Sequence, residues 1–395
     1  MAIPIDLLPT TTAPSADTAV AVRSLRWHAY AAVFAAACVM TGVYWDISWH
    51  MSIGRDTFWT PAHLLIQAGG LIAGLSSGYV ALTTTFLGTD AERQAAVSVW
   101  GFRAPLGAWT CVWGCVAMLT SAPFDNWWHN AYGLDVRIIS PPHALLAIGI
   151  FSIVVGALLL TLAQQNRAVG ADRRRLAWLL AATGGFLLMN IALFLTEYSE
   201  RRMMHGATYY YVTALSFCMA LSMLGRAIKL RWSATASAAL FTTFMLLLMW
   251  TIELFPATPK LGPIYQHLTH MVTLSFPPLI IVPAFFIDLV MHRFDGRLGT
   301  LSLATIVGPT FVVAFVAAQW PFASFLVRSP LAQGRVFNAD NFVYWMSPTY
   351  EALTKRFDPP NAWPIGAHLA IIAAIAILAS ALGLARGDWM TRVRR

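Results

Sequence analysis

Three residues of types that bind metal ions stand close together between two apolar stretches near the start of the chain. Asp46 precedes His50 by four positions, and His63 follows after a short polar loop that ends in Thr60 and Pro61. The i, i+4 spacing places Asp46 and His50 on one face of a helix, one turn apart. Threonine is a typical N-cap residue and proline is favoured at the first helical position, so a second helix is predicted to begin there with His63 as its third residue. A short loop makes the two helices antiparallel neighbours, so two imidazoles and one carboxylate are expected to converge at their turn.

The same constellation occurs a second time. Asp125 lies 79 positions after Asp46, and it is again followed by a histidine four positions later, His129. His143 lies 80 positions after His63 and is likewise preceded by a Ser-Pro-Pro helix start. The repeat predicts a duplicated metal-binding helix hairpin within residues 26–165.

Two histidines and one carboxylate form a ligand set that suits zinc, copper(II) or non-haem iron(II), with at least one position left for water, oxygen or substrate. An ionised aspartate near the hydrocarbon costs at least a few kcal/mol, and a bound cation offsets that cost. The alternative is that these residues are hydrogen-bonded interfacial groups within an aromatic belt. The tryptophans of such a belt would be Trp45, Trp49, Trp59, Trp127 and Trp128. The matched spacing and matched caps of the two copies favour metal sites.

The composition predicts an all-α polytopic membrane protein. Of 395 residues, 58% are hydrophobic and only 11% are charged, whereas soluble domains carry about a quarter charged residues. A span of about 20 residues leaves room for about ten transmembrane helices. The apolar stretches lie at residues 28–45, 62–86, 104–121, 142–164, 176–196, 207–228, 234–254, 264–290, 299–321 and 365–385. Residues 1–25 form an N-terminal cytoplasmic tail in this interpretation, and residues 166–395 add further helices and an outer loop at about 322–364.

The net charge of +8 comes largely from arginines near the expected helix ends, so it indicates orientation in the membrane and no nucleic-acid partner. Most of the 26 lysines and arginines fall on the side of the N-terminus, which predicts that both termini are inside. Both His/Asp constellations would then face outward, toward the periplasm if the membrane is a bacterial inner membrane. The four cysteines lie in apolar stretches, where they are expected to aid helix packing.

The stretch from Asp46 to His63 closely resembles a known metal-binding segment. In the C subunit of particulate methane and ammonia monooxygenases, an Asp-x3-His-x12-His triad binds copper within the membrane, beside runs similar to His50-Met51 and Arg55-Asp56-Thr57 of this chain. The resemblance covers about residues 27–165 and leaves residues 200–395 without a counterpart.

The second constellation resembles the second copper site of that family, an Asn-x3-His-x13-His set. His129 and His143 match, while Asp125 stands where the family has asparagine. A carboxylate in place of an amide adds a negative charge, which should strengthen cation binding and alter redox tuning.

The resemblance implies a copper-dependent, membrane-embedded oxygenase component that activates dioxygen for a small apolar substrate reaching the site through the bilayer. The implied ligands are Asp46, His50 and His63 for the catalytic copper, and Asp125, His129 and His143 for a second copper. Family members work with two further subunits, so oxygenase partner subunits are implied, or a homo-oligomer in their place. The chain has no dinucleotide or haem motif, so an external electron donor such as a quinol is needed.

Two other classes of function stay open at this point. A metal transport or storage protein would use the paired sites to pass copper or zinc across the outer leaflet, without oxygenase activity. A zinc hydrolase would require an additional carboxylate base near one triad, and Glu253 is too distant in sequence to be assigned to that role.

Overall fold

The computed structural model describes residues 26–54, 59–133, 140–201, 203–332, 334–338, 343–347, 349 and 365–394. Within these ranges, nine helices are long and apolar enough to cross a membrane. They are α2 (Arg26–Ser52), α3 (Pro61–Phe86), α5 (Leu106–Tyr132), α6 (Pro141–Arg167), α7 (Gly170–Phe194), α8 (Ala207–Ala227), α9 (Ser233–Ile252), α11 (Thr300–Arg328) and α13 (Ile365–Met390). The prediction of an all-α polytopic membrane protein is confirmed, and a lipid bilayer is the environment of these helices.

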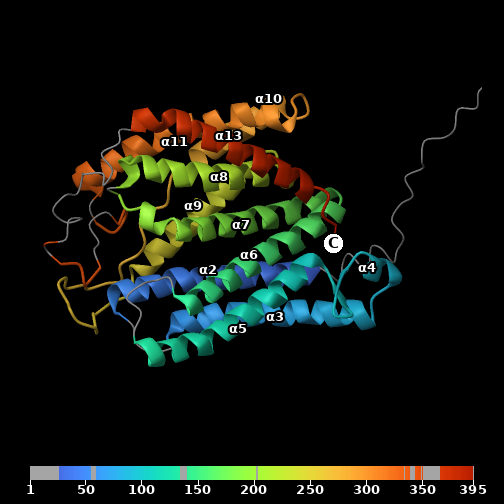
Figure 1. Ribbon diagram of the computed structural model, residues 1–395, viewed down its shortest axis with the longest axis horizontal. Helices are drawn as coiled ribbons and strands as arrows, with labels where there is room; N and C mark the ends of the chain where they lie inside the picture. Colours follow the sequence, from blue (N-terminus) through green and yellow to red (C-terminus); the bar gives the residue numbers. More distant parts are fainter. Residues whose placement is uncertain are drawn as a thin grey trace, which may run out of the picture.

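The long helices run back and forth along one common direction (Figure 1). Helices α2, α3, α5 and α6 pack together at the N-terminal side of the bundle, and α7, α8, α9, α11 and α13 complete it. The α2–α3 turn and the α5–α6 turn lie at the same end of the bundle. The short helix α4 (Asp90–Gln94) and the chain end after α13 lie at the opposite end. Both expected metal sites are therefore at one end of the molecule.

Close backbone contact holds α2 against α3. A Cβ atom on Gly69 would lie 2.6 Å from Cγ2 of Val39 and 2.8 Å from the carbonyl oxygen of Ala35. These separations are shorter than van der Waals contact, so only glycine permits this approach of the two helices. Gly69 lies about 1.7 helical turns after His63, so this contact sets how closely α2 and α3 approach near the site.

Helices α5 and α6 meet in the same way. A Cβ atom on Gly149 would lie 2.6 Å from Cγ of Met118 and 3.0 Å from its backbone nitrogen. Gly149 lies 80 positions after Gly69, and Met118 lies 79 positions after Val39. The offsets of 79 and 80 positions that relate the two ligand sets therefore also relate these two helix contacts.

The segment expected as a span at 264–290 differs from the prediction. Residues 264–280 are described and contain no helix, and only α10 (Ile281–Phe294) follows. Pro277 and Pro278 stand in the middle of the apolar stretch, and proline lacks the N–H that a helix interior needs. Hydropathy counts these prolines as apolar, which is why composition alone predicted a continuous span.

Side chains satisfy the backbone of this non-helical segment. The N–H of Val272 donates to Oγ of Ser52 at 2.7 Å, and the N–H of Leu279 donates to Oε1 of Gln319 at 2.9 Å. Ser52 and Gln319 are both fully buried. Non-helical backbone at membrane depth is tolerated when protein groups replace the missing helical hydrogen bonds.

Two further details differ from the expectation. Helix α11 continues through Pro321 to Arg328, so the outer loop expected at 322–364 begins later, and much of the rest of it lies outside the described residues, as does the tail expected at 1–25. Between α3 and α5 the chain forms an antiparallel hairpin of β1 (Val97–Val99) and β2 (Phe102–Ala104), which the sequence analysis did not predict.

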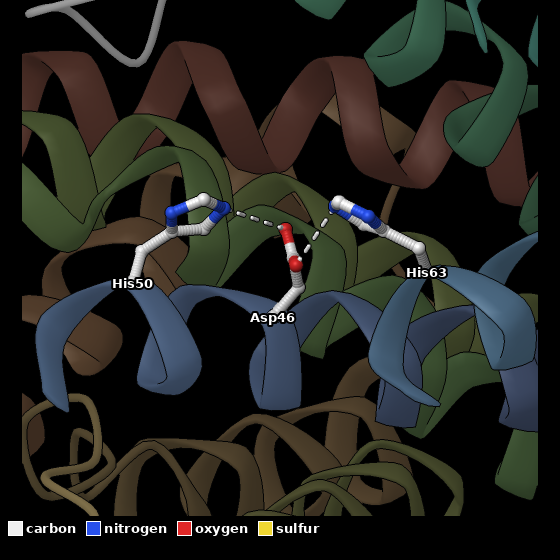
Figure 2. A group of neighbouring side chains, drawn as sticks. All are labelled: Asp46, His50 and His63. Atoms are coloured by element: carbon white, nitrogen blue, oxygen red, sulfur yellow. Dashed lines mark ion pairs between the residues drawn. The ribbon is translucent and has the colours of Figure 1, made fainter. Parts of the chain in front are cut away.

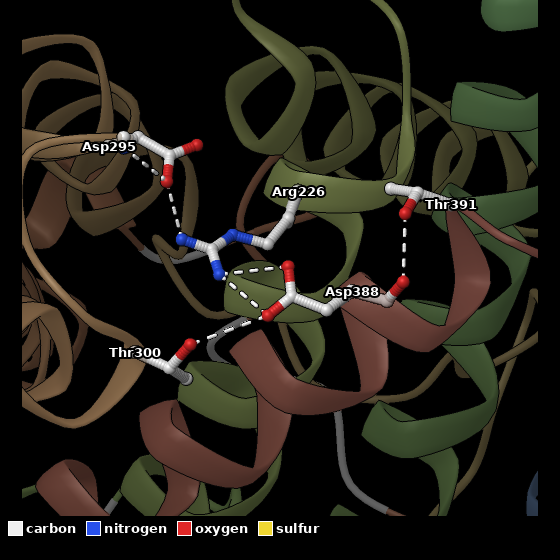
Figure 3. A network of polar contacts seen from close by, with 6 residues as sticks. Arg226, Asp295, Thr300, Asp388 and Thr391 are labelled. Carbon is white, nitrogen blue, oxygen red and sulfur yellow. Dashed lines mark hydrogen bonds and ion pairs between the residues drawn. The ribbon is translucent and has the colours of Figure 1, made fainter.

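An ion-pair network joins helices at the end opposite the candidate metal sites (Figure 3). Nη1 of Arg226, at the end of α8, donates to both carboxylate oxygens of Asp388 on α13 at 2.9 Å. Its Nη2 pairs with Asp295, which follows α10, and the Thr300 hydroxyl at the start of α11 donates to Asp388. One guanidinium thus joins the end of α8 to α13 and to the turn between α10 and α11.

Candidate metal centres

The first ligand group forms at the α2–α3 turn. Nε2 of His63 lies 3.0 Å from Oδ1 of Asp46, and Nε2 of His50 lies 3.7 Å from Oδ2. The Asp46 carboxylate lies between the two imidazoles (Figure 2). The Thr60 hydroxyl accepts a hydrogen bond from the backbone N–H of His63 at 3.3 Å, so the expected cap does orient the start of α3 and its third residue.

The separations in the first group suit ligands of one ion. Metal ligands at about 2.0–2.1 Å from a shared ion are about 3–4 Å from one another at ordinary coordination angles. The three candidate ligand atoms all lie within 4.8 Å of one another. Oδ1 of Asp46 is buried and accepts no hydrogen bond from the described residues, although His63 is near. A cation would give this oxygen a partner.

The second ligand group forms at the α5–α6 turn. Oδ1 of Asp125 lies 3.1 Å from Nε2 of His129 and 3.4 Å from Nε2 of His143. Ser140 caps α6, its hydroxyl accepting from the N–H of His143 at 3.4 Å. Pro123 lies inside α5, and the helix continues past it far enough to present both Asp125 and His129.

A backbone carbonyl orients the imidazole ring of His129. Nδ1 of His129 lies 3.1 Å from the carbonyl oxygen of Gly133. A carbonyl only accepts hydrogen bonds, so Nδ1 is the donor in this contact, and Nε2 is the ring nitrogen that faces Asp125. Such outer contacts are typical of metal-ligating histidines. Gly133 adopts a φ of 87°, and the glycine four residues after the histidine was the sequence signal for this contact.

The two groups have nearly the same shape. The imidazole centroids are 6.4 Å apart in both, with interplanar angles of 50° between His50 and His63 and 57° between His129 and His143. In each group one histidine is more exposed than the other ligands: the side chain of His50 is 39% exposed and that of His143 is 35% exposed. Each site is therefore held within the bundle end and open on one side.

The tryptophans near the sites divide into two kinds. Trp45 and Trp49 pack against a small apolar cluster that includes Ile53 and Met271, so they support α2 from behind the first site. Trp59 and Trp127 are mainly exposed, as expected of an aromatic belt. The exposure of Trp59 and Trp127 agrees with the interfacial interpretation of these two tryptophans.

Neither ligand group contains a fourth histidine or carboxylate in the described part of the chain. Glu253 is buried elsewhere and accepts a hydrogen bond from the Thr273 hydroxyl at 3.3 Å. Comparison of the chain with models of protein families, with curated proteins and with solved structures found no match.

Proposed function

We propose that this chain is a copper-binding integral membrane protein and a component of a monooxygenase-like oxidoreductase that activates dioxygen for a small apolar substrate. The observation that carries the proposal is the pair of matching two-histidine, one-aspartate groups at one end of the helix bundle. The ligands of the catalytic ion are Asp46, His50 and His63. A second ion is held by Asp125, His129 and His143.

Metal binding is supported by the ligand chemistry and by the membrane setting. Two neutral imidazoles and one carboxylate leave coordination positions for exogenous ligands. Charged aspartates at the ends of membrane helices are costly unless they are paired, and each of these two lies against two imidazoles. We further infer that the two hairpins arose by internal duplication, since offsets of 79 positions in the first helix and 80 in the second relate their ligands, caps and glycine contacts.

The choice of copper and of oxygen chemistry is supported by the resemblance of the Asp46–His63 segment to the C subunit of particulate methane and ammonia monooxygenases. When bound, copper would supply the redox chemistry of dioxygen activation. The chain's own residues hold and orient that ion, and the apolar helix surfaces admit a small apolar substrate from the bilayer. Electrons come from an external donor such as a quinol, and oxygenase partner subunits or further copies of the chain complete the assembly.

We place the metal centres on the outer side of the membrane, with both termini inside. The arginine distribution favours this orientation. In a bacterium this location would be the periplasmic face of the inner membrane. The location would let copper reach both sites without crossing the bilayer.

One observation favours the alternative, a copper or zinc transporter. Residues 264–280 cross part of the bundle without helix and are followed by the 14-residue helix α10. Discontinuous helices of this kind often form substrate and ion sites in secondary transporters. In that case the paired groups would be loading sites for a metal cargo.

Isotope labelling separates the two functions. Membranes containing the chain are supplied with a reduced quinol, a short alkene as probe substrate and ¹⁸O₂. The oxygenase proposal predicts ¹⁸O in the oxidised product, lost in His63→Ala and kept in His292→Ala, a histidine outside both groups. Copper uptake into sealed proteoliposomes without labelled product would overturn the oxygenase and establish the transporter.

A further inference from the structure

A polar cavity lies at the end of the bundle opposite the metal centres, where α4 and the β1–β2 hairpin connect α3 to α5. It has a volume of about 340 Å³. Its lining residues are Thr85, Asp90, Arg93, Gln94, Gly101 and Arg103. The hairpin that forms one wall is anchored by the indole of Trp109, whose Nε1–H donates to the carbonyl oxygen of Val97 at 3.0 Å.

The two arginines of this cavity are held by backbone carbonyls. Nη2 of Arg93 donates to the carbonyl oxygen of Phe86 at 3.3 Å, and Nη1 of Arg103 donates to the carbonyl oxygen of Arg93 at 3.4 Å. Among the described residues, neither guanidinium has an ion pair with a carboxylate. The buried Nε of Arg93 donates no hydrogen bond within that part of the chain. The two guanidinium groups are thus held at the cavity wall, and within the described part of the chain no carboxylate forms an ion pair with them.

The nearest acidic groups leave the cavity with positive charge. Glu92 does not line the cavity; it caps α4, accepting from the backbone N–H of Thr89 at 2.8 Å. Asp90 lines the cavity and offsets one of the two guanidinium charges. The formal charge of the lining residues is therefore positive by one unit, and Asp90 weakens the attraction of the cavity for anions.

Exposed apolar side chains are next to the lining residues Thr85 and Gly101 in the chain. Phe86, Leu87 and Trp100 are strongly exposed, and Phe86 meets Phe102 edge-on with ring centroids 6.1 Å apart. Below them, one face of α3 presents a stripe of exposed apolar side chains at helical spacing, Leu75, Tyr79, Leu82 and Phe86. A ligand that complements both the basic cavity and the apolar stripe on α3 has an anionic head and apolar chains.

We propose that this cavity binds the headgroup phosphate of an anionic phospholipid, with the acyl chains along the exposed face of α3. Arginine recognises phosphate through paired N–H donors, and basic pockets beside transmembrane helices bind anionic headgroups. The Gln94 amide adds a neutral donor at the same wall. Under the orientation expected from the arginines, this end lies in the cytoplasmic leaflet, where anionic lipids are attracted to basic side chains.

The test is a lipid titration of the purified full-length protein in detergent. Phosphatidylglycerol, phosphatidylcholine and inorganic phosphate are added separately, and bound lipid and thermal unfolding are measured. Phosphatidylglycerol should bind more tightly than phosphatidylcholine. Arg93→Gln and Arg103→Gln should each weaken its binding about fivefold, since an arginine near an anionic headgroup contributes about 1 kcal/mol. Asp90→Asn should strengthen binding, which keeps the test decisive even if an arginine variant fails to fold.

The matched control is Arg174→Gln, an exposed arginine at the same end on α7, which should leave lipid binding unchanged. Equal phosphatidylglycerol affinity in the wild type and the arginine variants would overturn the proposal. So would saturation by inorganic phosphate with the same arginine dependence and no gain from the lipid. That outcome would assign the cavity to a soluble anion.

Discussion

Gly69→Ala should weaken the first metal site although it changes no ligand. The added Cβ would lie 2.6 Å from Cγ2 of Val39 and 2.8 Å from the carbonyl oxygen of Ala35. Carbon atoms in contact are about 3.5–4.0 Å apart, so α2 and α3 must separate locally by about 1 Å. Overpacking of this kind costs about 1–3 kcal/mol, against a helix-propensity gain of up to about 1 kcal/mol. The expected net loss of stability is about 1–2 kcal/mol.

The separation should reach the ligands because Asp46 lies on α2 and His63 on α3. Their 3.0 Å contact should lengthen, and the metal affinity of the first site should fall about tenfold or more, as it does when groups that orient ligands are lost. The assays are thermal unfolding in detergent and competition with a copper chelator. Gly78→Ala on the same helix is the control, because its Cβ would meet nothing within 4 Å. Equal stability and equal copper affinity in Gly69→Ala and Gly78→Ala would refute the reasoning. So would an equal loss of copper affinity at the second site in Gly69→Ala.

Three further predictions concern other parts of the molecule. Arg226→Gln should lower the free energy of unfolding by about 1–3 kcal/mol in chemical denaturation, and Arg226→Lys should restore only part of it, since the single nitrogen of lysine cannot replace the two guanidinium nitrogens that contact Asp388 and Asp295 separately. Burial lowers the pKa of His205, so the unfolded state binds a proton at this residue more readily than the folded state. The stability contributed by neutral His205 should be full above about pH 6.5 and should fall as the pH drops below that value. Tm measured against pH tests this, and His205→Gln should flatten the dependence. Asp125→Asn keeps a ligand oxygen and loses a charge, so copper affinity of the second site should fall at least about tenfold in a chelator titration, while Asp125→Leu should abolish binding there.

The convergence of the ligands was predictable from local rules. Helical periodicity places Asp46 beside His50, and the Thr60-Pro61 helix start brings His63 to the third position of α3, as the structure shows. These rules act over one or two helical turns, and the short connection in the sequence makes α2 and α3 antiparallel neighbours. The fold class followed in the same way from the scarcity of charge and the length of the apolar stretches.

The prediction of a continuous span at 264–290 was wrong because hydropathy does not take backbone hydrogen bonding into account. Pro277 and Pro278 were the available signal. The partners that make the non-helical backbone tolerable, such as Gln319 with Leu279, come from a distant helix. No local pattern in the sequence indicates that pairing.

The hairpin between α3 and α5 could have been found from its turn. Trp100 and Gly101 both adopt positive φ, of 50° and 86°, which is the requirement of the favoured two-residue hairpin turn. The glycine was a signal, while a tryptophan in this conformation is uncommon. The contact of Gly69 with Val39 required both helices to be placed, so sequence spacing alone did not predict it.

Metal content tests the central claim most directly. Purified protein, loaded with copper and freed of excess metal, is measured for copper per chain in the wild type, His50→Ala, His129→Ala and the double variant. Two ions per chain are predicted in the wild type, one in each single variant and none in the double variant, with His292→Ala retaining both. Equal copper in the wild type and the double variant would contradict the assignment of both centres.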